Sequence, residues 1–378
     1  MYYFDSAATT KVDRDVGKLL GDLFANSFGN ASSSHRLGEA TKAEFAKAKE
    51  EIANCLGCGT GSIIFTSGAT ESNNTAVANI AGLAGPGKKR VIVSPIEHPS
   101  ILEPLRHYEK LGAIDLDFLR VGQDCVVSVE ELESKMGEDV AAVVVMAVNN
   151  ETGAIQPVEE ISKTCRQNGV AFHCDFVQGF GKIKFSPENY NFASFSAHKV
   201  YGPKGIGMLY VKNPEEFKPL MFGGGQQGGF RCGTEPVELI RALALTVTSL
   251  YRESEANNQY IKMLRGYMLD KLSDCPEVES NLPQGGVPHI LNISVKGVRS
   301  DALALVFYQN DIMLSQGSAC SSNHEEKSLS PVLLAMGLPE EKIRSSFRIS
   351  FSKTNTIRDI EFVVDTIKNA VNKYKVSR

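Results

Sequence analysis

The sequence predicts an α/β protein whose larger part is built on a mostly parallel sheet of seven strands. Two observations predict this fold. The expected strands are apolar on both faces, as in residues 141–148, and such strands lie in sheets that are covered on both sides. Helical patterns also alternate with these strands, which is typical of parallel sheets. The seven expected strands are 62–66, 91–93, 116–119, 141–148, 170–174, 192–195 and 206–211.

Helices are expected where apolar residues recur with the spacing of one helical face. In the segment 36–55, for example, Phe45, Ala48 and Ile52 follow this spacing. Gly57 then follows as a residue that ends a helix. The helices expected in the larger part are 12–26, 36–55, 70–83, 100–111, 129–136, 158–168 and 236–257.

Residues 258–378 carry a different pattern of shorter strands and helices, which predicts a smaller α+β domain. We therefore expect a large domain over 12–257 and a small domain that combines a short arm, 1–11, with 258–378. The helices expected in the small domain are 259–272, 301–310, 331–336 and 357–374, and its strands are 290–295, 312–314 and 347–351.

The composition argues against several classes of protein. The chain has 378 residues, of which 42% are hydrophobic and 22% charged, as in ordinary globular proteins. A formal net charge of −4 provides no basic field for direct binding of nucleic acid. No apolar run approaches a membrane span, and the first residues lack the pattern of a signal peptide. The eight scattered cysteines favour free thiols and a cytoplasmic location.

Chemically active side chains follow five of the expected strands. Ligands of open parallel sheets bind beyond the carboxyl ends of the strands, so we expect these groups along one edge. Each group alone also has a structural explanation: the segment 67–70 can cap a helix, although free N–H groups at a helix start also bind phosphate. The groups are Ser67, Ala69, Thr70 and Glu71, then Glu97 and His98, then Asn149, Asn150 and Glu151, then Asp175 and Gln178, and finally Ser196, His198 and Lys199.

Lys199 and Lys204 flank one turn, and either of them is a candidate for the chemically reactive lysine. Lys204 follows a proline and is typical of a solvated surface lysine, which is also the usual state of any lysine in a loop. Lys199 lies nearer the strand end, where a cleft can hold an amine that forms a Schiff base with a carbonyl cofactor. A phosphate cradle, the carboxylate of Asp175 and this amine on one edge together predict a site for pyridoxal phosphate.

Two further candidates lie downstream. Cys320 lies in a small, polar loop, where a thiol is exposed and its thiolate is a nucleophile, whereas most cysteines are buried and inert. Arg348 lies in an apolar strand and needs a partner, which is either a substrate carboxylate or an internal salt bridge. Cys55 and Cys58 form a CxxC pair without a second pair, so we interpret them as a coincidence and predict no metal site.

These residues together resemble the cysteine desulfurases of the NifS/IscS type, in the class V group of fold-type I pyridoxal phosphate enzymes. The resemblance covers nearly the whole chain, and it implies the fold of that group. The matching segments are 65–73 (FTSGATESN), 97–98 (EH), 148–153 (VNNETG), Asp175 with Gln178, 196–199 (SAHK), 201–205 (YGPKG), 231–234 (RCGT) and 317–321 (GSACS).

The resemblance implies a role for each matching residue. Lys199 would bind the cofactor and move protons, His98 would stack on its ring and assist acid–base steps, and Asp175 would pair with the ring nitrogen. Cys320 would take the sulfur of L-cysteine as a persulfide and leave L-alanine. The other implied contacts are Gln178 and Asn150 to the ring oxygen or the substrate, Ala69, Thr70, Ser196 and His198 to the phosphate, Thr234 across a homodimer interface, and Arg348 with Asn30 to the substrate carboxylate.

The resemblance leaves the sulfur acceptor open, as an iron–sulfur scaffold or a tRNA thiolation enzyme. Three residues depart from the usual pattern without removing a catalytic group: Ala31 replaces a proline, Gly228 an arginine and Gln316 a serine. The alternative activities are those of a selenocysteine lyase and of a class V aminotransferase. A non-catalytic sulfur carrier is a further alternative, but it would have no need of Lys199 with Asp175.

Overall fold

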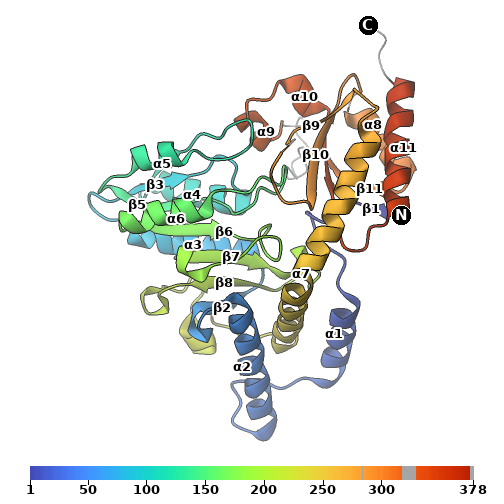
Figure 1. The fold of residues 1–378 in the computed structure, drawn as a ribbon. Helices are drawn as coiled ribbons and strands as arrows, with labels where there is room; N and C mark the ends of the chain where they lie inside the picture. The colour runs from blue at the N-terminus through green and yellow to red at the C-terminus, as the bar shows by residue number, and fades with distance from the viewer. Residues whose placement is uncertain (283, 299, 317–328, 375–378) are drawn as a thin grey trace.

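The computed structural model describes residues 1–282, 284–298, 300–316 and 329–374 (Figure 1). Its largest element is a sheet of seven strands, which confirms the predicted fold. Neighbouring strands run parallel, except that β8 is antiparallel to both of its neighbours. In spatial order the strands are β2 (Ile63–Thr66), β8 (Gly207–Val211), β7 (Phe192–Ser196), β6 (Ala171–Asp175), β5 (Val140–Val144), β3 (Arg90–Val93) and β4 (Asp115–Phe118).

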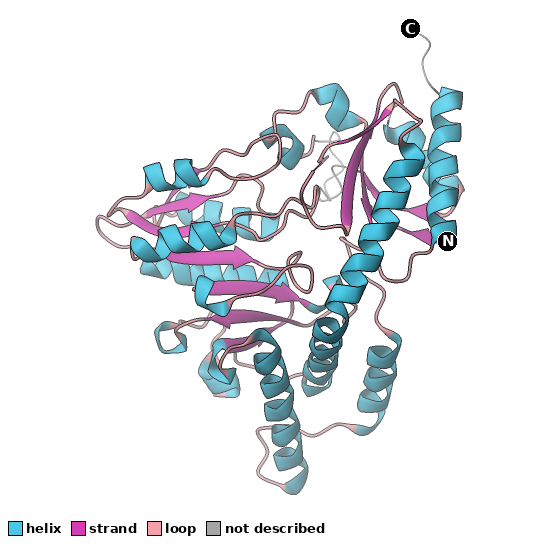
Figure 2. Cartoon of the chain, in the orientation of Figure 1, coloured by secondary structure: helices cyan, strands magenta, loops and turns pink. Residues whose placement is uncertain are grey.

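Helices cover both faces of this sheet, which is why its strands are apolar on both sides (Figure 2). The apolar residues of one face pack against α3 (Ala69–Leu83) and α4 (Pro99–Lys110). Those of the other face pack against α2 (Arg36–Leu56), α5 (Val129–Lys135), α6 (Val158–Gln167) and the first half of α7 (Val237–Leu272).

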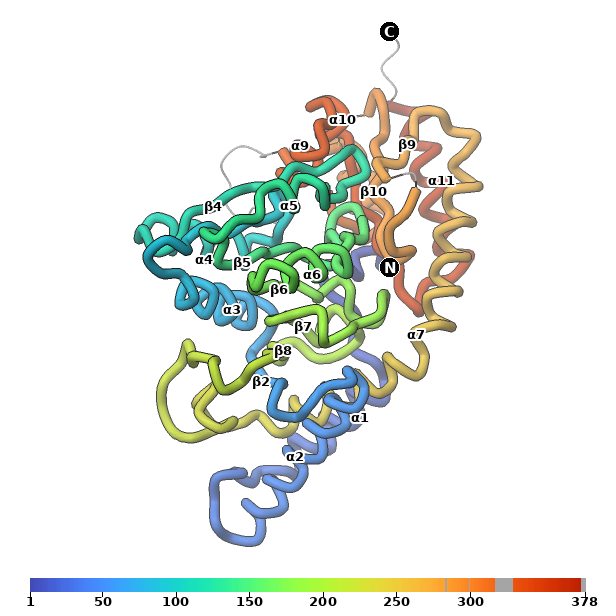
Figure 3. Tube along the Cα trace, turned by 60° about the vertical axis from the view of Figure 1, so that its left-hand side comes forward, coloured from blue at the N-terminus to red at the C-terminus, as the bar shows by residue number. Residues whose placement is uncertain are grey.

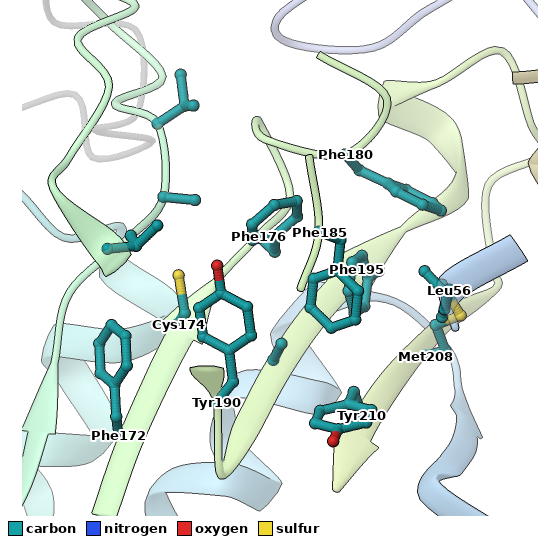
Figure 4. Close-up of a cluster of buried hydrophobic side chains, with 14 of the residues drawn as sticks. Leu56, Phe172, Cys174, Phe176, Phe180, Phe185, Tyr190, Phe195, Met208 and Tyr210 are labelled. Atoms are coloured by element: carbon teal, nitrogen blue, oxygen red, sulfur yellow. The ribbon is translucent and has the colours of Figure 1, made fainter. Parts of the chain in front are cut away.

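An aromatic cluster on the second face supports the loop that follows β6 (Figure 4). Phe176 and Phe180 of this loop pack on Phe195 of β7, with ring centroids 5.7 and 4.9 Å apart. Phe176 also contacts Phe185, at 5.1 Å. Aromatic pairs at such distances bury large areas in defined orientations. The cluster therefore fixes the backbone on both sides of Gln178, one of the predicted site residues.

α7 is one continuous helix of 36 residues, whereas the sequence predicted two helices, 236–257 and 259–272. The asparagine pair 257–258 lies where the break was expected. Asparagine costs at most about 0.7 kcal/mol relative to alanine within a helix. Packing on both sides outweighs this cost, because Leu250 belongs to the core of the large sheet and Ile261 to a second core.

The rest of the chain surrounds a second sheet of four antiparallel strands. In spatial order these strands are β12 (Ser315–Gln316), β13 (Ser346–Ser350), β10 (Ile290–Val295) and β9 (Val278–Ser280). The helices are α8 (Ser300–Gln309), α9 (Pro331–Ala335), α10 (Glu340–Arg344) and α11 (Ile357–Tyr374). The sequence did not predict β9, β12 or α10, because such short elements show no clear apolar period.

The N-terminal arm packs against this smaller unit. β1 (Tyr2–Tyr3) pairs in parallel with β11 (Ile312–Met313), and Phe4 is buried in the second core. The sequence indicated a polar arm, since a strand of two residues carries no periodic signal. The domain limits at residues 12, 257 and 258 stay a prediction. Within the described residues, no helix is both long and apolar enough to cross a membrane.

Candidate active site

Lys199 lies directly after β7, in a 3-10 turn over Ala197–Lys199. Its side chain is half-buried, whereas Lys204 is exposed, which is the difference that the sequence predicted. The Nζ atom donates hydrogen bonds to the carbonyl oxygens of Ala7 and Ala8, both at 2.7 Å. The N-terminal arm therefore holds the amine of Lys199 at the carboxyl edge of the sheet.

A glycine shapes the turn behind Lys199. The N–H of Gly202 donates to the carbonyl oxygen of Ala197 at 3.0 Å. A Cβ atom on Gly202 would lie only 2.8 Å from the Cβ of Ala197. Any larger residue at 202 would therefore displace the turn that carries Lys199.

Asp175 is the last residue of β6 and is buried. Its Oδ2 accepts a hydrogen bond from the Nδ2 of Asn73 at 2.8 Å, and its Oδ1 accepts from the N–H of Val177 at 3.0 Å. Asn73, on α3, also donates to the Oγ of Ser100 at 2.9 Å. These bonds fix the carboxylate of Asp175 at the same edge as Lys199.

His98 is the N-cap residue of α4. The N–H of Ser100 donates to its Nδ1 at 3.1 Å, so the proton of the neutral ring lies on Nε2. Burial lowers the pKa of His98; the charge of Asp175 opposes this shift and that of Lys199 adds to it. The charges of both Asp175 and Lys199 therefore act on the ring of His98, which can exchange a proton at Nε2.

Glu97 is buried next to this pair. Its Oε1 accepts a hydrogen bond from the N–H of Met146 at 2.7 Å, and its Oε2 has no partner among the described residues. Burial raises the pKa of Glu97 well above its usual value, and the charge of Asp175 raises it further. Burial and the charge of Asp175 therefore both disfavour a second negative charge at Glu97.

The N-terminus of α3 lies beside the end of β7. Gly68 precedes the helix with φ 155° and ψ −179°, a conformation that only glycine adopts readily. A Cβ atom on Gly207 would lie 2.7 Å from the Cα of Gly68, so the two glycines allow close contact. A Cβ atom on Gly68 would lie 3.9 Å from the Oγ of Ser196. The structure thus brings Ser196 next to the helix start that carries Ala69 and Thr70.

His198 faces the N-terminal arm, where its Nδ1 lies 3.2 Å from the Oγ1 of Thr9. Burial, with the charges of Lys199 and Lys204 adding to it, lowers the pKa of His198 to about 4. The ring is therefore neutral at pH 7. It can donate or accept one hydrogen bond with an anion but does not carry the charge that would neutralise it.

Gln178 lies between Lys199 and the interior. Its Nε2 donates to the carbonyl oxygen of Ala7 at 3.0 Å, and its Oε1 accepts from the Nζ of Lys182 at 2.8 Å. Because Lys199 donates to the same carbonyl oxygen, Gln178 and Lys199 are brought together as the sequence predicted.

Arg348, on β13, is buried and forms internal contacts. Its Nη2 donates to the Oδ1 of Asp5 at 2.9 Å and to the Oγ of Ser315 at 2.8 Å, and its Nη1 donates to the carbonyl oxygen of Asn150 at 3.0 Å. Its Nε is buried without a partner among the described residues. The internal salt bridge considered from the sequence exists, and the guanidinium group is largely enclosed by the chain itself.

Three predicted site residues are not placed with the others. Asn30 is exposed in the connection between α1 (Arg14–Asn26) and α2, where its Oδ1 accepts from the N–H of Ser32 at 2.9 Å. Figures 1 and 3 show this connection at the opposite end of the molecule from β10, the neighbour of the strand that carries Arg348. Thr234 is exposed just before α7. Cys320 lies outside the described residues.

The departures noted in the sequence have local explanations. Gly228 has a φ of 70°, so an arginine there would be strained. Gln316 donates through its Nε2 to the carbonyl oxygen of Ser300 at 3.2 Å. Nothing in the structure explains Ala31. Cys55 and Cys58 are half-buried, and the described residues contain no cluster of ligands for a metal ion.

Sequence reasoning missed the polar residues that support this site. Asn73 holds Asp175, Asp5 holds Arg348 and Lys182 holds Gln178. Of these, Asn73 offered a signal, because an asparagine on the buried face of a helix that packs on a sheet needs a polar partner. Asp5 offered none, since its partner lies 343 residues away in the sequence.

Comparisons with known proteins agree with this arrangement. The profile of the family described as Aminotransferase class-V matches residues 2–363. The "Cysteine desulfurase IscS" of Rickettsia bellii (strain OSU 85-389) is 38% identical over 380 aligned residues, which cover 99% of this chain and 92% of the relative. The protein of that name from Rickettsia felis (strain ATCC VR-1525 / URRWXCal2) is 37% identical with the same coverage.

Solved structures give the same result. A "NIFS-LIKE PROTEIN" superposes with a TM-score of 0.91 at 32% identity, over 98% of this chain and 99% of the other. A structure titled "SspA in complex with cysteine" superposes with a TM-score of 0.83 at 31% identity, and the match covers 94% of this chain and 100% of the other. The resemblance inferred from the motifs is confirmed, and the chain belongs to the class-V aminotransferase family, among the cysteine desulfurases of the NifS/IscS type.

Proposed function

We propose that this protein takes the sulfur of L-cysteine with the help of pyridoxal 5'-phosphate, leaves L-alanine and carries the sulfur on Cys320 as a persulfide. The observation that carries the proposal is the meeting of Lys199, His98 and Asp175 at one edge of the sheet. Asn73 donates to both Asp175 and Ser100, and Ser100 donates to His98, while Lys199 follows the neighbouring strand β7. The relative titled as a complex with cysteine supports L-cysteine as the substrate.

The residues present fit pyridoxal phosphate. The buried carboxylate of Asp175 offers a partner for a ring nitrogen, and the neutral ring of His98 offers a stacking surface. Ala69, Thr70 and Ser196 border a helix start that glycines hold against β8, which suits a phosphate group. When bound, the cofactor supplies an electron sink for cleavage at the substrate's carbons and sulfur.

Each residue then has a task of its own. Lys199 would hold the cofactor through its amine and would afterwards take up or release a proton at Nζ. His98 exchanges a proton at Nε2, while Ser100 keeps its ring in place. Arg348 binds the substrate carboxylate through its guanidinium group, next to the Asp5 pair. The backbone carbonyl oxygen of Asn150 accepts from Arg348, so Asn150 lies beside the same guanidinium group.

Cys320 receives the sulfur. Its thiolate attacks the sulfur of the bound substrate, the carbon–sulfur bond breaks, and the new sulfur–sulfur bond leaves a persulfide on Cys320. The carbon that loses sulfur takes up a proton and leaves as alanine. We propose an iron–sulfur scaffold or a tRNA thiolation enzyme in the cytoplasm as the acceptor, and the name IscS of the Rickettsia relatives supports the first.

We also propose that the protein is a homodimer, in which Thr234 and Asn30 complete the site of the partner subunit. Both residues are exposed in the single chain. Large apolar side chains are exposed as well: Phe28, in the same connection as Asn30, is 82% exposed, and Phe222 is 84% exposed. Exposed apolar residues of this size are typical of protein interfaces.

The test is turnover of L-cysteine by the purified protein with pyridoxal phosphate, with alanine quantified and Cys320 examined by mass spectrometry for an added sulfur atom. The expected result is alanine and a persulfide on Cys320. Cys320→Ala should abolish sulfur transfer to an acceptor thiol, and transfer at the full rate in this variant would contradict the role of Cys320. Selenocysteine added as a competing substrate tests the alternative activity. A selenocysteine lyase would convert selenocysteine and leave cysteine unreacted.

A further inference from the structure

A small cavity lies beside Lys199. Its volume is about 20 Å³, enough for a water molecule. It lies between the loop after β6, the N-terminal arm, α7 and the start of β10, and it is bordered by Lys199, Gln178 and Lys182. Lys182 has no role in the mechanism described so far.

The orientation of the Gln178 amide follows from its two partners. The Nζ of Lys182 can only donate, so the Gln178 atom 2.8 Å away is the oxygen Oε1. The carbonyl of Ala7 can only accept, so the atom 3.0 Å from it is the nitrogen Nε2. The amide nitrogen therefore lies on the side of Ala7 and Lys199, and its second N–H can bind an anionic oxygen of the cofactor. Without Lys182, the opposite orientation would place Oε1 against the carbonyl of Ala7.

Three side chains with buried polar atoms lie in a cavity wall whose surface is otherwise largely apolar. The Oγ of Ser6, the Nδ1 of His289 and the Oδ1 of Asn258 have no partner among the described residues. His289 and Ser6 are only 8% and 6% exposed, and both border the cavity. Buried polar atoms without protein partners cost free energy unless they bind water or a ligand. These atoms are therefore suited to bind a water molecule in the cavity next to Lys182.

Lys182 and Lys199 also interact through their charges. Burial, with the charge of Lys199 adding to it, lowers the pKa of Lys182 to about 7. Burial, with Lys182 adding to it, also lowers the pKa of His289 well below its usual value, so His289 brings no further positive charge to the cavity. Repulsion acts equally on both partners. A charge on Lys182 therefore disfavours a positive charge at the nitrogen of Lys199.

We propose that Lys182 is a positioning residue of the cofactor site, which holds the Gln178 amide with its nitrogen toward Lys199 and places a positive charge behind the Lys199 amine. This inference rests on the proposed function. Lys182 lies outside the cofactor site, yet it would control two properties of that site. These are the hydrogen bond from Gln178 to the cofactor and the protonation of the Lys199 nitrogen.

Two measurements test this role without relying on turnover. The apoprotein is titrated with pyridoxal 5'-phosphate to obtain a dissociation constant, and the loaded protein is titrated with base while its visible absorbance is followed. In Lys182→Met, we expect the dissociation constant to rise about tenfold, because a hydrogen bond from a charged group is lost. The midpoint of the absorbance transition should rise by about one pH unit, because a neighbouring positive charge is removed.

Two companion variants separate the contributions. Lys182→Gln keeps a donor for Gln178 without the charge, so it should shift the midpoint with a smaller change in affinity. Lys182→Arg restores donor and charge and should lie closer to the unmodified protein than Lys182→Met does in both measurements. Lys184→Met is the matched control, since Lys184 is exposed and lies two residues away. This control should leave both values unchanged.

The results separate a positioning role from a structural one. If Lys182→Met and Lys182→Gln only lower the melting temperature, with affinity and midpoint as in the Lys184→Met control, the inference is overturned while the proposed function stands. If Lys182→Met does not fold, Lys182→Gln and Lys182→Arg decide the question through the midpoint. If the unmodified protein binds no pyridoxal phosphate, both the proposed function and this inference fail.

Discussion

Asp5 and Arg348 form an ion pair of 2.9 Å that connects the N-terminal arm to the strand β13. The same guanidinium group is the predicted partner of the substrate carboxylate, so two carboxylates share one cation when substrate is bound. The pair is largely buried, and its side chains are 23% and 7% exposed. Asp5 therefore both stabilises the fold and competes for Arg348.

Asp5→Asn should expose this competition. The variant should lose about 2 kcal/mol in the free energy of unfolding, as expected for a charged hydrogen bond. The KM for L-cysteine should fall, because the substrate no longer competes with a second carboxylate. Urea unfolding and steady-state kinetics measure the two effects, with Asp15→Asn, an exposed carboxylate of α1, as the control. A higher KM would mean that Asp5 orients Arg348 rather than competing for it.

Glu151 makes stability depend on pH. Burial raises its pKa from 4.5 to about 7, although hydrogen bonding from Ser330 and the charge of Arg348 oppose the shift. The folded state therefore holds a proton that the unfolded state releases above pH 4.5. This contribution to stability is complete below pH 4.5 and is lost as the pH rises through 7. Its size is about 3 kcal/mol.

Glu151→Gln removes this dependence, because the amide does not ionise and can still accept from Ser330, as Glu151 does at 2.5 Å. Urea unfolding between pH 5 and pH 8 should show the variant gaining stability relative to the unmodified protein as the pH rises. A constant difference across this range would show that Glu151 does not titrate there.

Asn73 should control cofactor affinity through Asp175. Asn73→Leu removes the 2.8 Å hydrogen bond to Asp175, so the carboxylate loses its position and we expect about tenfold weaker binding of pyridoxal phosphate. Asn79→Ala is a matched control on the same helix. Its amide is buried but bonds the backbone of Lys218, so it should lower stability and leave cofactor affinity unchanged. Equal affinities in the two variants would contradict the role of Asn73.

Gly228→Arg should destabilise the protein, although an arginine is common at this position in the family. The φ of 70° at Gly228 costs a residue with a Cβ atom about 1–2 kcal/mol. Gly225→Arg provides the comparison, because Gly225 has a φ of −85° and open space around it. Thermal unfolding should place the Gly228 variant below the Gly225 variant; the reverse order would show that the loop rearranges without strain.

The sequence was sufficient to predict the large sheet and most of the side chains at the edge that carries the candidate site. Runs such as 140–144 carry a strong apolar signal, and the groups that follow parallel strands must meet at one edge. What could not be predicted depends on contacts between distant segments. The N-terminal arm reaches Lys199 through Ala7 and Arg348 through Asp5, and no local pattern encodes either contact. Asn30 and Thr234 are expected to act across a dimer, which one chain cannot display.

The continuous course of α7 has a consequence for how the protein unfolds. Leu243 and Val247 of its first half belong to the core of the large sheet, and Leu264 and Met268 of its second half belong to the second core. A helix keeps its end turns only while its length is packed. If either core melted, the helix would therefore unwind from that end toward the half that packs in the other core. The two halves should lose their structure together, in one cooperative transition, despite having separate sheets.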